Sequence, residues 1–314
     1  MKKPPSYGEI VENEDCNCQA LYQWAESNAI SIQMTSSVRI TVVVENTAQG
    51  AGILAEHGLA YWIDWNGHRV LFDTGQGSVL VSNAYKLGTP LHETDAIVLS
   101  HGHYDHTGGL AEMLNNGLAV PIYAHPAAFD PKYARNRDGT AREIGIPVAV
   151  REALHRHSSN VIKMESPTTI VKGLTATGPV PRTTDFEDTA GSFFLDAACL
   201  QPDPLIDDQS LFFETHEGIV VLLGCAHSGI INTLRYIVEL SGNKPIRAVI
   251  GGMHLVNASP ERITRTIEEI RHLDVRLLAP CHCTGTAATV ALWNAFPTIC
   301  VTCHAGTTFD FEPT

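Results

Sequence analysis

Four side chains that commonly bind metals fall within six residues of this chain, and this density constrains its fold and function more than any other feature. His101, His103, Asp105 and His106 all lie in the run SHGHYDHTGG, residues 100–109. Imidazole nitrogens and carboxylate oxygens are ligands of zinc and of other transition metals. The run therefore predicts a metal site. The alternative, a polar loop in which histidines accumulated by chance, is disfavoured by the density of donors.

The preceding run LHETDAIVLS is typical of a β-strand, so the cluster is expected in the loop where that strand ends. Gly102 is expected to loosen this loop. The first two histidines would then point one way, and the aspartate and third histidine the other way. Such an arrangement suits two adjacent metal ions, because a single ion does not need all four donors.

Composition restricts the class of protein. A chain of 314 residues with 44% hydrophobic and 18% charged residues is long enough for one large α/β domain or two small ones. No stretch is apolar enough to span a membrane, and the N-terminus lacks the apolar core of a secretory signal, so a cytoplasmic protein is expected. A net charge of −13 argues against nucleic acid and anionic membrane as partners.

Eight cysteines in a chain of this length do not resemble a disulfide scaffold. Three pairs are closely spaced, and each pair offers a possible metal site: Cys16 with Cys18, Cys281 with Cys283, and Cys300 with Cys303. None of them has the spacing of a zinc ribbon. Reduced thiols are therefore expected, with Cys199 and Cys300 as ordinary buried cysteines.

Strand and helix patterns alternate along most of the chain. Residues 1–37 are predicted to form an N-terminal extension with a short helix at LYQWAE, and residues 38–314 the main domain. VRITVVVEN predicts a strand, and YWIDWNGHRVLFDTG a hairpin that turns at Asn66 and Gly67. Thr107 is expected to cap the helix in TGGLAEMLNN. Repeated strand, loop and helix units, with further strands in SLFFETHEGIVVLLGCAH, RAVIGGMHL, RLLAPCHCTG and TTFDF and helices in INTLRYIVEL and ERITRTIEEIRHL, indicate a layered α/β fold.

Residues 124–182 show few periodic apolar positions and many turn residues, so they are interpreted as a lid or insertion over the site. The basic residues in and next to this segment are candidates for binding an anionic substrate. They are Lys132, Arg135, Arg137, Arg142 and Arg182. A solvated basic face is the alternative.

Three more histidines each follow an apolar strand, as the first cluster does. They are His227 in VVLLGCAHSG, His254 in RAVIGGMHL and His282 in RLLAPCHCTG. Any one of them alone would be a hydrogen-bonded loop histidine, but together with the cluster they are expected to converge. A dinuclear site needs about six to eight protein donors, a number that these residues supply.

Two carboxylates are candidates for supporting roles. Asp73, in LFDTG, is placed to hydrogen-bond a ligating imidazole, or alternatively forms a turn. Asp208, in IDDQSL, either binds metal or caps a turn, and capping is favoured. The remaining candidates lack the position after a strand and are assigned surface or structural roles: His125, His155, His157, His216, His272 and His304.

The pattern His-x-His-x-Asp-His after a strand, preceded by LFDTG, resembles the metallo-β-lactamase superfamily. This resemblance implies an α/β (α+β) fold, a four-layer αββα sandwich of two mixed sheets with outer helices. It also implies a dinuclear metal site at the sheet edge. His101 and His103 would hold one metal, and Asp105 and His106 the other, with Asp105 also counted among the catalytic residues.

Several segments resemble one branch of this superfamily, the 7,8-dihydropterin-6-yl-methyl-4-(β-D-ribofuranosyl)aminobenzene 5'-phosphate synthases. They are AEHGLAYWI, LFDTGQ, LSHGHYDHTGGL, PRTTDFE, DDQSLFF, GCAHSGIINTL, GGMHL and APCHCTG. The resemblance runs from Val38 to the C-terminus. The family name implies condensation of a dihydropterin methyl diphosphate with a ribofuranosyl aminobenzene phosphate, with release of diphosphate.

The chain departs from the superfamily pattern near its later strands. Many members place Gly-Asp, with a bridging aspartate, where this chain has Gly224 and Cys225. His227 is the candidate for the missing ligand, and Cys225 is a possible one. By strand order His282 matches the last metal ligand, which leaves His254 as an acid, base or phosphate-binding group. The roles of His254 and His282 are exchangeable at this stage.

The leading hypothesis is an enzyme with two divalent metal ions that acts on an anionic, phosphorylated small molecule. Zinc is the favoured metal, with iron and manganese as alternatives. One alternative is a metallo-hydrolase of a phosphodiester, lactone or thioester. Another is a metal- or redox-sensing protein that relies on Cys16, Cys18, Cys281 and Cys283. A homo-oligomer is possible, with the N-terminal extension docked on a neighbouring subunit.

Overall fold

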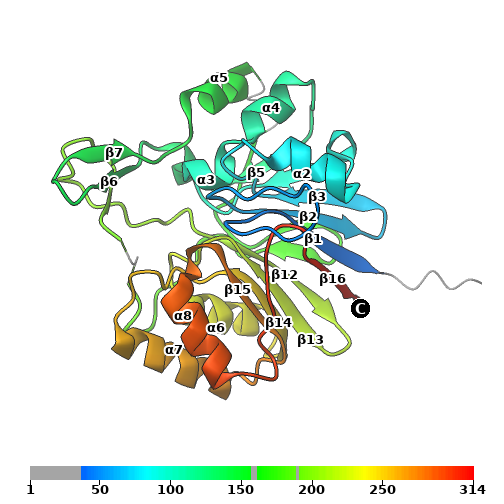
Figure 1. Ribbon diagram of the computed structural model, residues 1–314, viewed down its shortest axis with the longest axis vertical. Coiled ribbons are helices and arrows are strands. Elements are labelled where there is room, and N and C mark those ends of the chain that lie inside the picture. Colours follow the sequence, from blue (N-terminus) through cyan, green and yellow to red (C-terminus); the bar gives the residue numbers. More distant parts are fainter. Residues whose placement is uncertain (1–36, 157–160, 189–190) are drawn as a thin grey trace, which may run out of the picture. The chain divides into compact units, whose positions relative to one another are not determined.

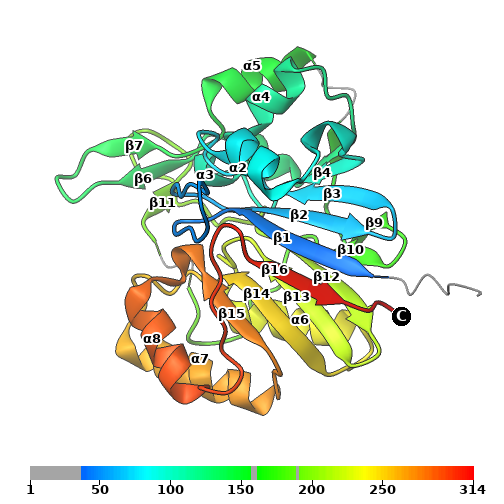
Figure 2. The same ribbon diagram turned by 45° about the vertical axis from the view of Figure 1, so that its right-hand side comes forward.

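Figure 1 shows the computed structural model, which describes residues 37–156, 161–188 and 191–314. The predicted N-terminal extension and its helix at LYQWAE lie outside the described residues, except for Ser37. Two mixed β-sheets pack face to face, and helices cover the outer face of each sheet (Figures 1 and 2). The predicted four-layer αββα sandwich is therefore confirmed.

The first sheet has seven strands in the order β16-β1-β2-β3-β4-β5-β8. Strands β16 to β3 pair antiparallel, whereas β3, β4, β5 and β8 pair parallel. The bounds of these strands are β1 Val38–Val44, β2 Ala60–Trp65, β3 His68–Phe72, β4 Ala96–Val98, β5 Ile122–Ala124, β8 Val161–Lys163 and β16 Thr308–Phe311.

The second sheet has six strands in the order β15-β14-β13-β12-β10-β9. Strands β13, β14 and β15 pair parallel, and the others antiparallel. The bounds are β9 Thr168–Val171, β10 Leu174–Ala176, β12 Ser210–Thr215, β13 Gly218–Leu223, β14 Ile246–Gly252 and β15 Leu278–Cys281.

Both faces of each sheet are buried. In β3, Val70 and Phe72 face the core between the sheets, where they join Phe213 and Leu222 of the second sheet, while Leu71 faces the outer helices. Strands buried on both faces are continuous apolar runs, as in GIVVLL. The helices on the first sheet are α2 Leu80–Leu87, α4 Leu110–Asn115 and α5 Val148–Arg156, and those on the second are α6 Ile230–Leu240, α7 Pro260–His272 and α8 Thr286–Ala295.

The predicted hairpin turn is confirmed. Asn66 and Gly67 connect β2 to β3, and both have positive φ, 47° and 85°. This backbone twist matches the twist of the paired strands, and asparagine and glycine adopt it at low cost. The strands and helices expected after residue 210 are also present, from β12 to β16.

The prediction that Thr107 caps a helix was wrong. The chain is already helical at α3, Tyr104–Thr107, so Thr107 is the last residue of that short helix. Its hydroxyl donates to the carbonyl of His103, four residues earlier, at 2.9 Å. Gly109 precedes α4 instead, without a side-chain cap.

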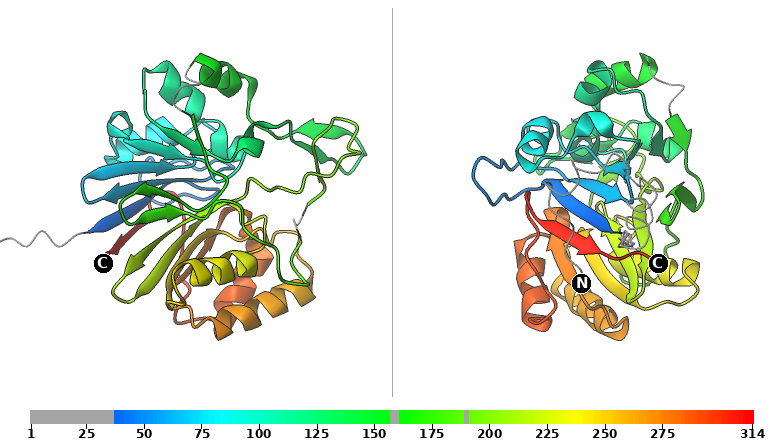
Figure 3. Two further views of the ribbon diagram at one scale, coloured as in Figure 1. Left: turned by 180° about the vertical axis from the view of Figure 1, so that it is seen from behind. Right: turned by 90° about the vertical axis from the view of Figure 1, so that its right-hand side faces the viewer.

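The segment 124–182, interpreted as a lid, is divided among three sheets. Strands β8, β9 and β10 fall within it but belong to the two core sheets. Only the hairpin of β6 (Tyr133–Arg135) and β7 (Ala141–Glu143) stands off from the core, where it pairs with β11 (Phe193–Phe194) in a third, small sheet (Figures 1 and 3). The 3₁₀ helices are η1 Leu91–Glu93, η2 Pro126–Phe129 and η4 His282–Thr284. Whether the hairpin acts as a lid stays a prediction.

The prediction that Lys132 binds an anionic substrate was wrong, because its side chain is buried and paired. It is 1% exposed, and its Nζ lies 2.9 Å from Asp203 Oδ2 and 3.1 Å from Asp207 Oδ1. Asp207 in turn accepts a hydrogen bond from the backbone NH of Gly102, at 2.8 Å. The buried lysine thus anchors the loop of the histidine cluster. No helix in the described ranges is long and apolar enough to cross a membrane.

Replacing Lys132 with methionine should lower the free energy of unfolding by about 3–5 kcal/mol, because the two buried carboxylates lose their counter-charge. Urea denaturation measures this change. The matched control is Lys163→Met, since Lys163 is exposed. Equal stability of the two variants would contradict this role of Lys132.

Candidate metal centre

The site is assembled where neighbouring strands end. Asp73 follows β3, and the cluster from His101 to His106 follows β4 in the first sheet. His227, His254 and His282 follow β13, β14 and β15, which are adjacent and parallel in the second sheet. Parallel strands release their loops on the same side of a sheet, so this topology collects donors from five loops.

The backbone at these loops is strained. Asp73, Ala226, His254 and His282 have φ values of 60°, 54°, 43° and 51°, in the left-handed region that residues with side chains rarely adopt. Such conformations cost about 1–3 kcal/mol each and concentrate at functional sites. Their position directly after the strands indicates that these loops form a functional site and do not only connect strands to helices.

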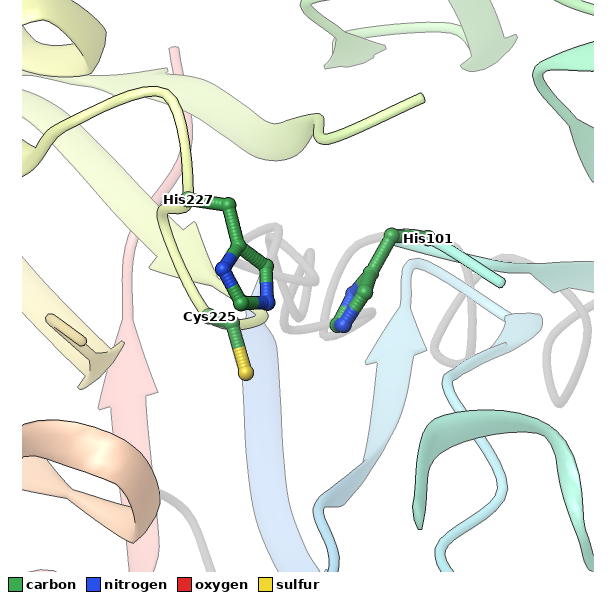
Figure 4. Close-up of side chains that lie close together, drawn as sticks. All are labelled: His101, Cys225 and His227. Carbon is green, nitrogen blue, oxygen red and sulfur yellow. The ribbon is translucent and has the colours of Figure 1, made fainter. Parts of the chain in front are cut away.

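His101, His103 and His227 form one half of the site. His101 Nε2 and His103 Nδ1 lie 2.9 Å apart, and the ring of His227 lies 4.8 Å and 5.0 Å from their rings. Figure 4 shows His101 and His227 facing each other across a gap, with the sulfur of Cys225 beside it. Two nitrogens that bind one zinc ion at its usual bond length lie about 3 Å apart.

Asp105, His106 and His282 form the other half. Asp105 Oδ2 lies 3.4 Å from His282 Nε2 and 3.7 Å from His106 Nε2. The two Nε2 atoms lie 3.2 Å from each other, and Cys225 Sγ lies 3.1 Å from that of His106. Cys225 therefore touches both halves, because its sulfur also lies within 4.8 Å of donor atoms of His101 and His227.

Hydrogen bonds around Asp73 fix the orientation of two rings. The fully buried carboxylate accepts from His106 Nδ1 at 2.7 Å, and from Ser100 N and Oγ at 2.7 and 2.6 Å. Because the Ser100 hydroxyl donates to Asp73, it accepts from His101 Nδ1, at 2.9 Å. The protons of both imidazoles are thus on Nδ1, and both Nε2 lone pairs point into the site.

His282 is held in the same way from the loop after β1. Its Nδ1 donates to Asn46 Oδ1 at 3.0 Å, and its backbone NH donates to Glu45 Oε1 at 2.7 Å. Its Nε2 lone pair therefore faces that of His106 at 3.2 Å. Two lone pairs repel each other at this separation unless a cation lies between them or beside them. The arrangement requires a proton or a metal ion.

Gly102 was expected to loosen the loop. Instead, it allows a close contact. A Cβ on this residue would lie 2.0 Å from the carbonyl oxygen of Ala128. The backbone NH of Gly102 is also bound by Asp207. The glycine lets the loop between His101 and His103 pack against the first turn of η2, so the loop is rigid.

Asp208 supports the loop that carries His227. Its Oδ2 accepts from the backbone NH of Ser228 at 2.8 Å, while its Oδ1 is buried without a hydrogen bond. Burial raises the pKa of this carboxyl to about 6. Asp208 therefore has the position of a turn cap, the role favoured from the sequence, with one oxygen left over.

The electrostatic environment favours neutral imidazoles at His101 and His103 next to an ionised Asp105. Burial lowers the pKa of His103 to about 3 and, with the neighbouring imidazoles, that of His101 well below its usual value. Burial opposes ionisation of Asp105, but His106 and His282 outweigh it and hold the pKa of Asp105 low. For His106, burial is outweighed by Asp73 and Asp105, which raise its pKa. Neutral nitrogen and anionic oxygen are the forms that bind a metal.

Unsatisfied polar atoms also point to a missing group. His103 Nε2 and His254 Nδ1 are buried and have no hydrogen-bond partner. Buried polar atoms normally have one, so each such atom calls for an explanation. The residues present fit a divalent metal ion: they offer imidazole, carboxylate and thiol donors in an interior that excludes most water.

His57 belongs to the site but was missed from the sequence. Its Nε2 lies 3.2 Å from Asp105 Oδ2, and its ring stacks on that of His282 with centroids 5.3 Å apart. The side chain is half exposed, so it forms the solvent side of the centre. It precedes strand β2, whereas the other histidines of the centre follow strands. Its segment AEHGL was noticed only as part of the family resemblance.

Phe193 also escaped the sequence analysis. It lies in β11 of the small third sheet, and its ring packs on His103, His227 and His254 at centroid distances of 5.2, 5.3 and 5.9 Å. Nothing in the local sequence around Phe193 indicated a site. The contact exists only because β11 pairs with β6, 58 residues or more earlier in the chain.

The two arginines proposed to bind substrate have different surroundings. Arg142, in β7, shares a side-chain hydrogen bond with Tyr104, the residue before Asp105. Arg182 is exposed, and its Nη2 donates to the carbonyl of Pro204 at 2.6 Å. Arg142 thus lies at the edge of the centre, while the hydrogen bond of Arg182 is to the backbone. Substrate binding by either residue stays a prediction.

The six cysteines in the described ranges carry no disulfide, as expected, and Cys199 and Cys300 are buried. Cys16 and Cys18 lie outside the described residues. His125 is engaged in local structure, since its Nδ1 accepts from the backbone NH of Ala127 at 3.1 Å. His304 likewise bonds Thr307 and Ala305. His157 also lies outside the described residues.

Comparison with known proteins identifies the family. The family model described as the metallo-beta-lactamase superfamily matches residues 54–282. An uncharacterized protein of Methanocaldococcus jannaschii is 35% identical over 81% of this chain and 93% of its own length. The 7,8-dihydropterin-6-methyl-4-(beta-D-ribofuranosyl)-aminobenzene-5'-phosphate synthase of the same organism is 28% identical over 90% of this chain and 99% of its own.

A solved structure is also similar. Tm1679, described as a metal-dependent hydrolase of the beta-lactamase superfamily, superimposes with a TM-score of 0.74 and 32% identity, over 87% of this chain and 98% of the other. The match of the family model agrees with the two packed sheets and with the position of the histidine cluster after β4. The chain belongs to the metallo-beta-lactamase superfamily.

Proposed function

We propose that this protein is an enzyme with two divalent metal ions that acts on an anionic, phosphorylated small molecule. The observation that supports it most is the pair of Nε2 lone pairs of His106 and His282, which face each other at 3.2 Å and are each fixed by a hydrogen bond on Nδ1. Such a pair costs energy unless a proton or a metal ion lies between the two nitrogens or beside them, and the adjacent carboxylate and thiol donors favour the metal ion. Zinc is the favoured metal, with iron and manganese as alternatives.

The ligands divide into two sets. His101, His103 and His227 would hold one ion, and Asp105, His106 and His282 the other, with Cys225 between them. When bound, two such ions supply positive charge and Lewis acidity for phosphate or carbonyl oxygens. The geometry favours His282 over His254 as the ligand near Asp105, because His282 lies 3.4 Å from that carboxylate while His254 contacts His227.

The surrounding residues would bind and shield the substrate. Phe193 covers three imidazoles and limits access of water from that side. His57 and Tyr104 line the half-exposed side near Asp105, where Arg142 brings a positive charge. An anionic group entering there would meet the guanidinium first. The earlier hypothesis that His254 acts as an acid, base or phosphate-binding group stays a prediction.

Two reaction types fit this site. The similarity to the dihydropterin synthase over almost the full length of both chains supports a condensation with release of diphosphate. The similarity to Tm1679, described as a metal-dependent hydrolase, supports hydrolysis. The candidate substrates of that reaction stay a phosphodiester, a lactone or a thioester. In both reactions negative charge develops on oxygen, and positive charge at the centre stabilises it. We favour the synthase reaction, because that relative spans more of this chain.

The purified chain should contain metal, and His106→Ala should lose it, because this variant removes one ligand nitrogen and one of the hydrogen bonds to the Asp73 carboxylate. Elemental analysis by mass spectrometry measures the content. His216→Ala, at an exposed turn, is the control and should bind as much metal as the wild type. Wild-type protein with well below one metal per chain, unrestored by zinc, manganese or iron, would refute the proposal.

Asp73→Asn should lower metal affinity about 10–100-fold, since the amide no longer accepts both hydrogen bonds that orient His106 and Ser100. Asparagine tolerates the positive φ of this position, so the fold should persist. Competition with a chromogenic chelator gives the affinity. The control Asp138→Asn lies in the β6–β7 turn and should leave affinity unchanged. An unaltered affinity in Asp73→Asn would exclude this positioning role.

Substrate screening on the metal-loaded protein separates the two reactions. For the synthase reaction we expect release of diphosphate only when a dihydropterin methyl diphosphate and a ribofuranosyl aminobenzene phosphate are both present. Chromatography of the product and a diphosphate assay measure it. Turnover of simple phosphodiesters, lactones or thioesters, with no pterin present, would remove the synthase assignment and establish the hydrolase.

A further inference from the structure

A second group of metal-binding side chains adjoins the proposed centre and shares Cys225 with it. Cys225, His254 and Cys283 are all buried, and each offers a donor atom within 4.8 Å of those of the other two. They follow β13, β14 and β15, the three adjacent parallel strands of the second sheet. Cys225 belongs to both groups, whereas Cys283 joins only this one among the groups of three or more donors in the described residues.

The contacts within this group are specific. The backbone NH of His254 donates to Cys283 Sγ at 3.3 Å, and Cys283 Sγ lies 3.6 Å from the carbonyl oxygen of Cys225. A Cβ on Gly252 would lie 2.7 Å from Cys283 Sγ, so glycine at this position leaves the room that the sulfur occupies. The three residues are thus held together by the ends of their strands.

The group also contains an unsatisfied donor. His254 Nδ1 is buried and makes no hydrogen bond, although the residue is only 8% exposed. His254 adopts φ = 43°, a strained conformation that places an imidazole among two thiols. A buried polar atom without a hydrogen-bond partner, on a histidine that groups with two cysteines, is explained if a metal ion is the partner.

We propose that Cys225, His254 and Cys283 bind a third divalent metal ion, of the zinc class, beside the dinuclear centre. In tetrahedral zinc sites two sulfurs lie about 3.8 Å apart, and sulfur and nitrogen about 3.5 Å apart. The donor atoms of these three residues all lie within 4.8 Å of one another. Two thiolates and an imidazole select zinc over magnesium, calcium and manganese. The ion would tie together the ends of β13, β14 and β15, which also carry His227 and His282.

The proposed third site shares only Cys225 with the ligands of the two ions of the proposed function. Variants at its other residues can therefore test the third site separately. Cys225 Sγ also lies 3.1 Å from His106 Nε2, so replacing Cys225 would disturb both sites. Cys283 is the more selective probe of the third ion, because it is not a ligand of the two-ion centre, whereas His254 also contacts His227. Cys281 is the matched control: it lies two residues from Cys283 on the same strand end, but its sulfur faces Tyr61, 3.9 Å from the hydroxyl.

The test uses the full-length chain, freed of metal and titrated with Co²⁺. We expect Cys283→Ser to bind one equivalent less than the wild type and to lose part of the thiolate-to-cobalt absorption in the near ultraviolet. His254→Asn should lose the same equivalent, and asparagine tolerates its positive φ. Cys281→Ser should match the wild type. His103→Ala, which alters only the dinuclear centre, should keep the absorption that depends on Cys283.

The proposal is overturned if Cys283→Ser and His254→Asn, shown to be folded by circular dichroism, bind as much Co²⁺ as the wild type with unchanged absorption. It is also overturned if His103→Ala loses all thiolate absorption, because the sulfur ligand would then belong to the dinuclear centre. A measurement on the wild type needs no variant: cadmium-113 NMR should show a resonance of cadmium bound by two sulfurs. The absence of that resonance equally refutes the third site.

Discussion

The carboxylate of Asp73 is the interaction on which the rest of the centre depends. It is fully buried at the end of β3, and its hydrogen bonds to Ser100 and His106 join that strand to the loop after β4. A buried charge is tolerated only when its hydrogen bonds are satisfied, so the loop must adopt this one arrangement. Through Ser100 the same carboxylate also sets the proton position of His101, so the Nε2 lone pairs of both His106 and His101 point into the site.

The two sheets contribute to the centre in different ways. The first sheet supplies the cluster from one loop, which Asp73 and the buried pair of Lys132 and Asp207 hold rigid. The second sheet supplies one histidine from each of three adjacent strands, and these side chains converge only when the sheets pack face to face. Assembly of the site and formation of the core are therefore one event, and the strained backbone after the strands is offset by that core.

Local patterns in the sequence predict the parts of this structure that arise from short-range rules. The hairpin at Asn66 and Gly67, the histidine cluster, and the three later histidines were all found in this way, because turn chemistry and the end of an apolar run are visible in a few residues. Thr107 was misassigned, since the chain becomes helical three residues earlier than its capping pattern suggests. His57 and Phe193 reach the centre through tertiary packing, from a loop before β2 and from the small third sheet, and no local pattern marks such contacts.

The charge of the donors bears on the kind of substrate. Imidazoles carry no charge when they bind a metal, so with two divalent ions bound the only compensation in the two ligand sets is Asp105 and, if ionised, Cys225. Where many relatives of the superfamily have an aspartate, this chain has that single thiol. With both proposed ions bound, the centre would keep a net positive charge inside a chain whose total charge is −13. In an anionic protein with one electropositive site, an anionic substrate is repelled from most of the surface and attracted to that site. A phosphorylated substrate supplies the missing negative charge, and a neutral one does not.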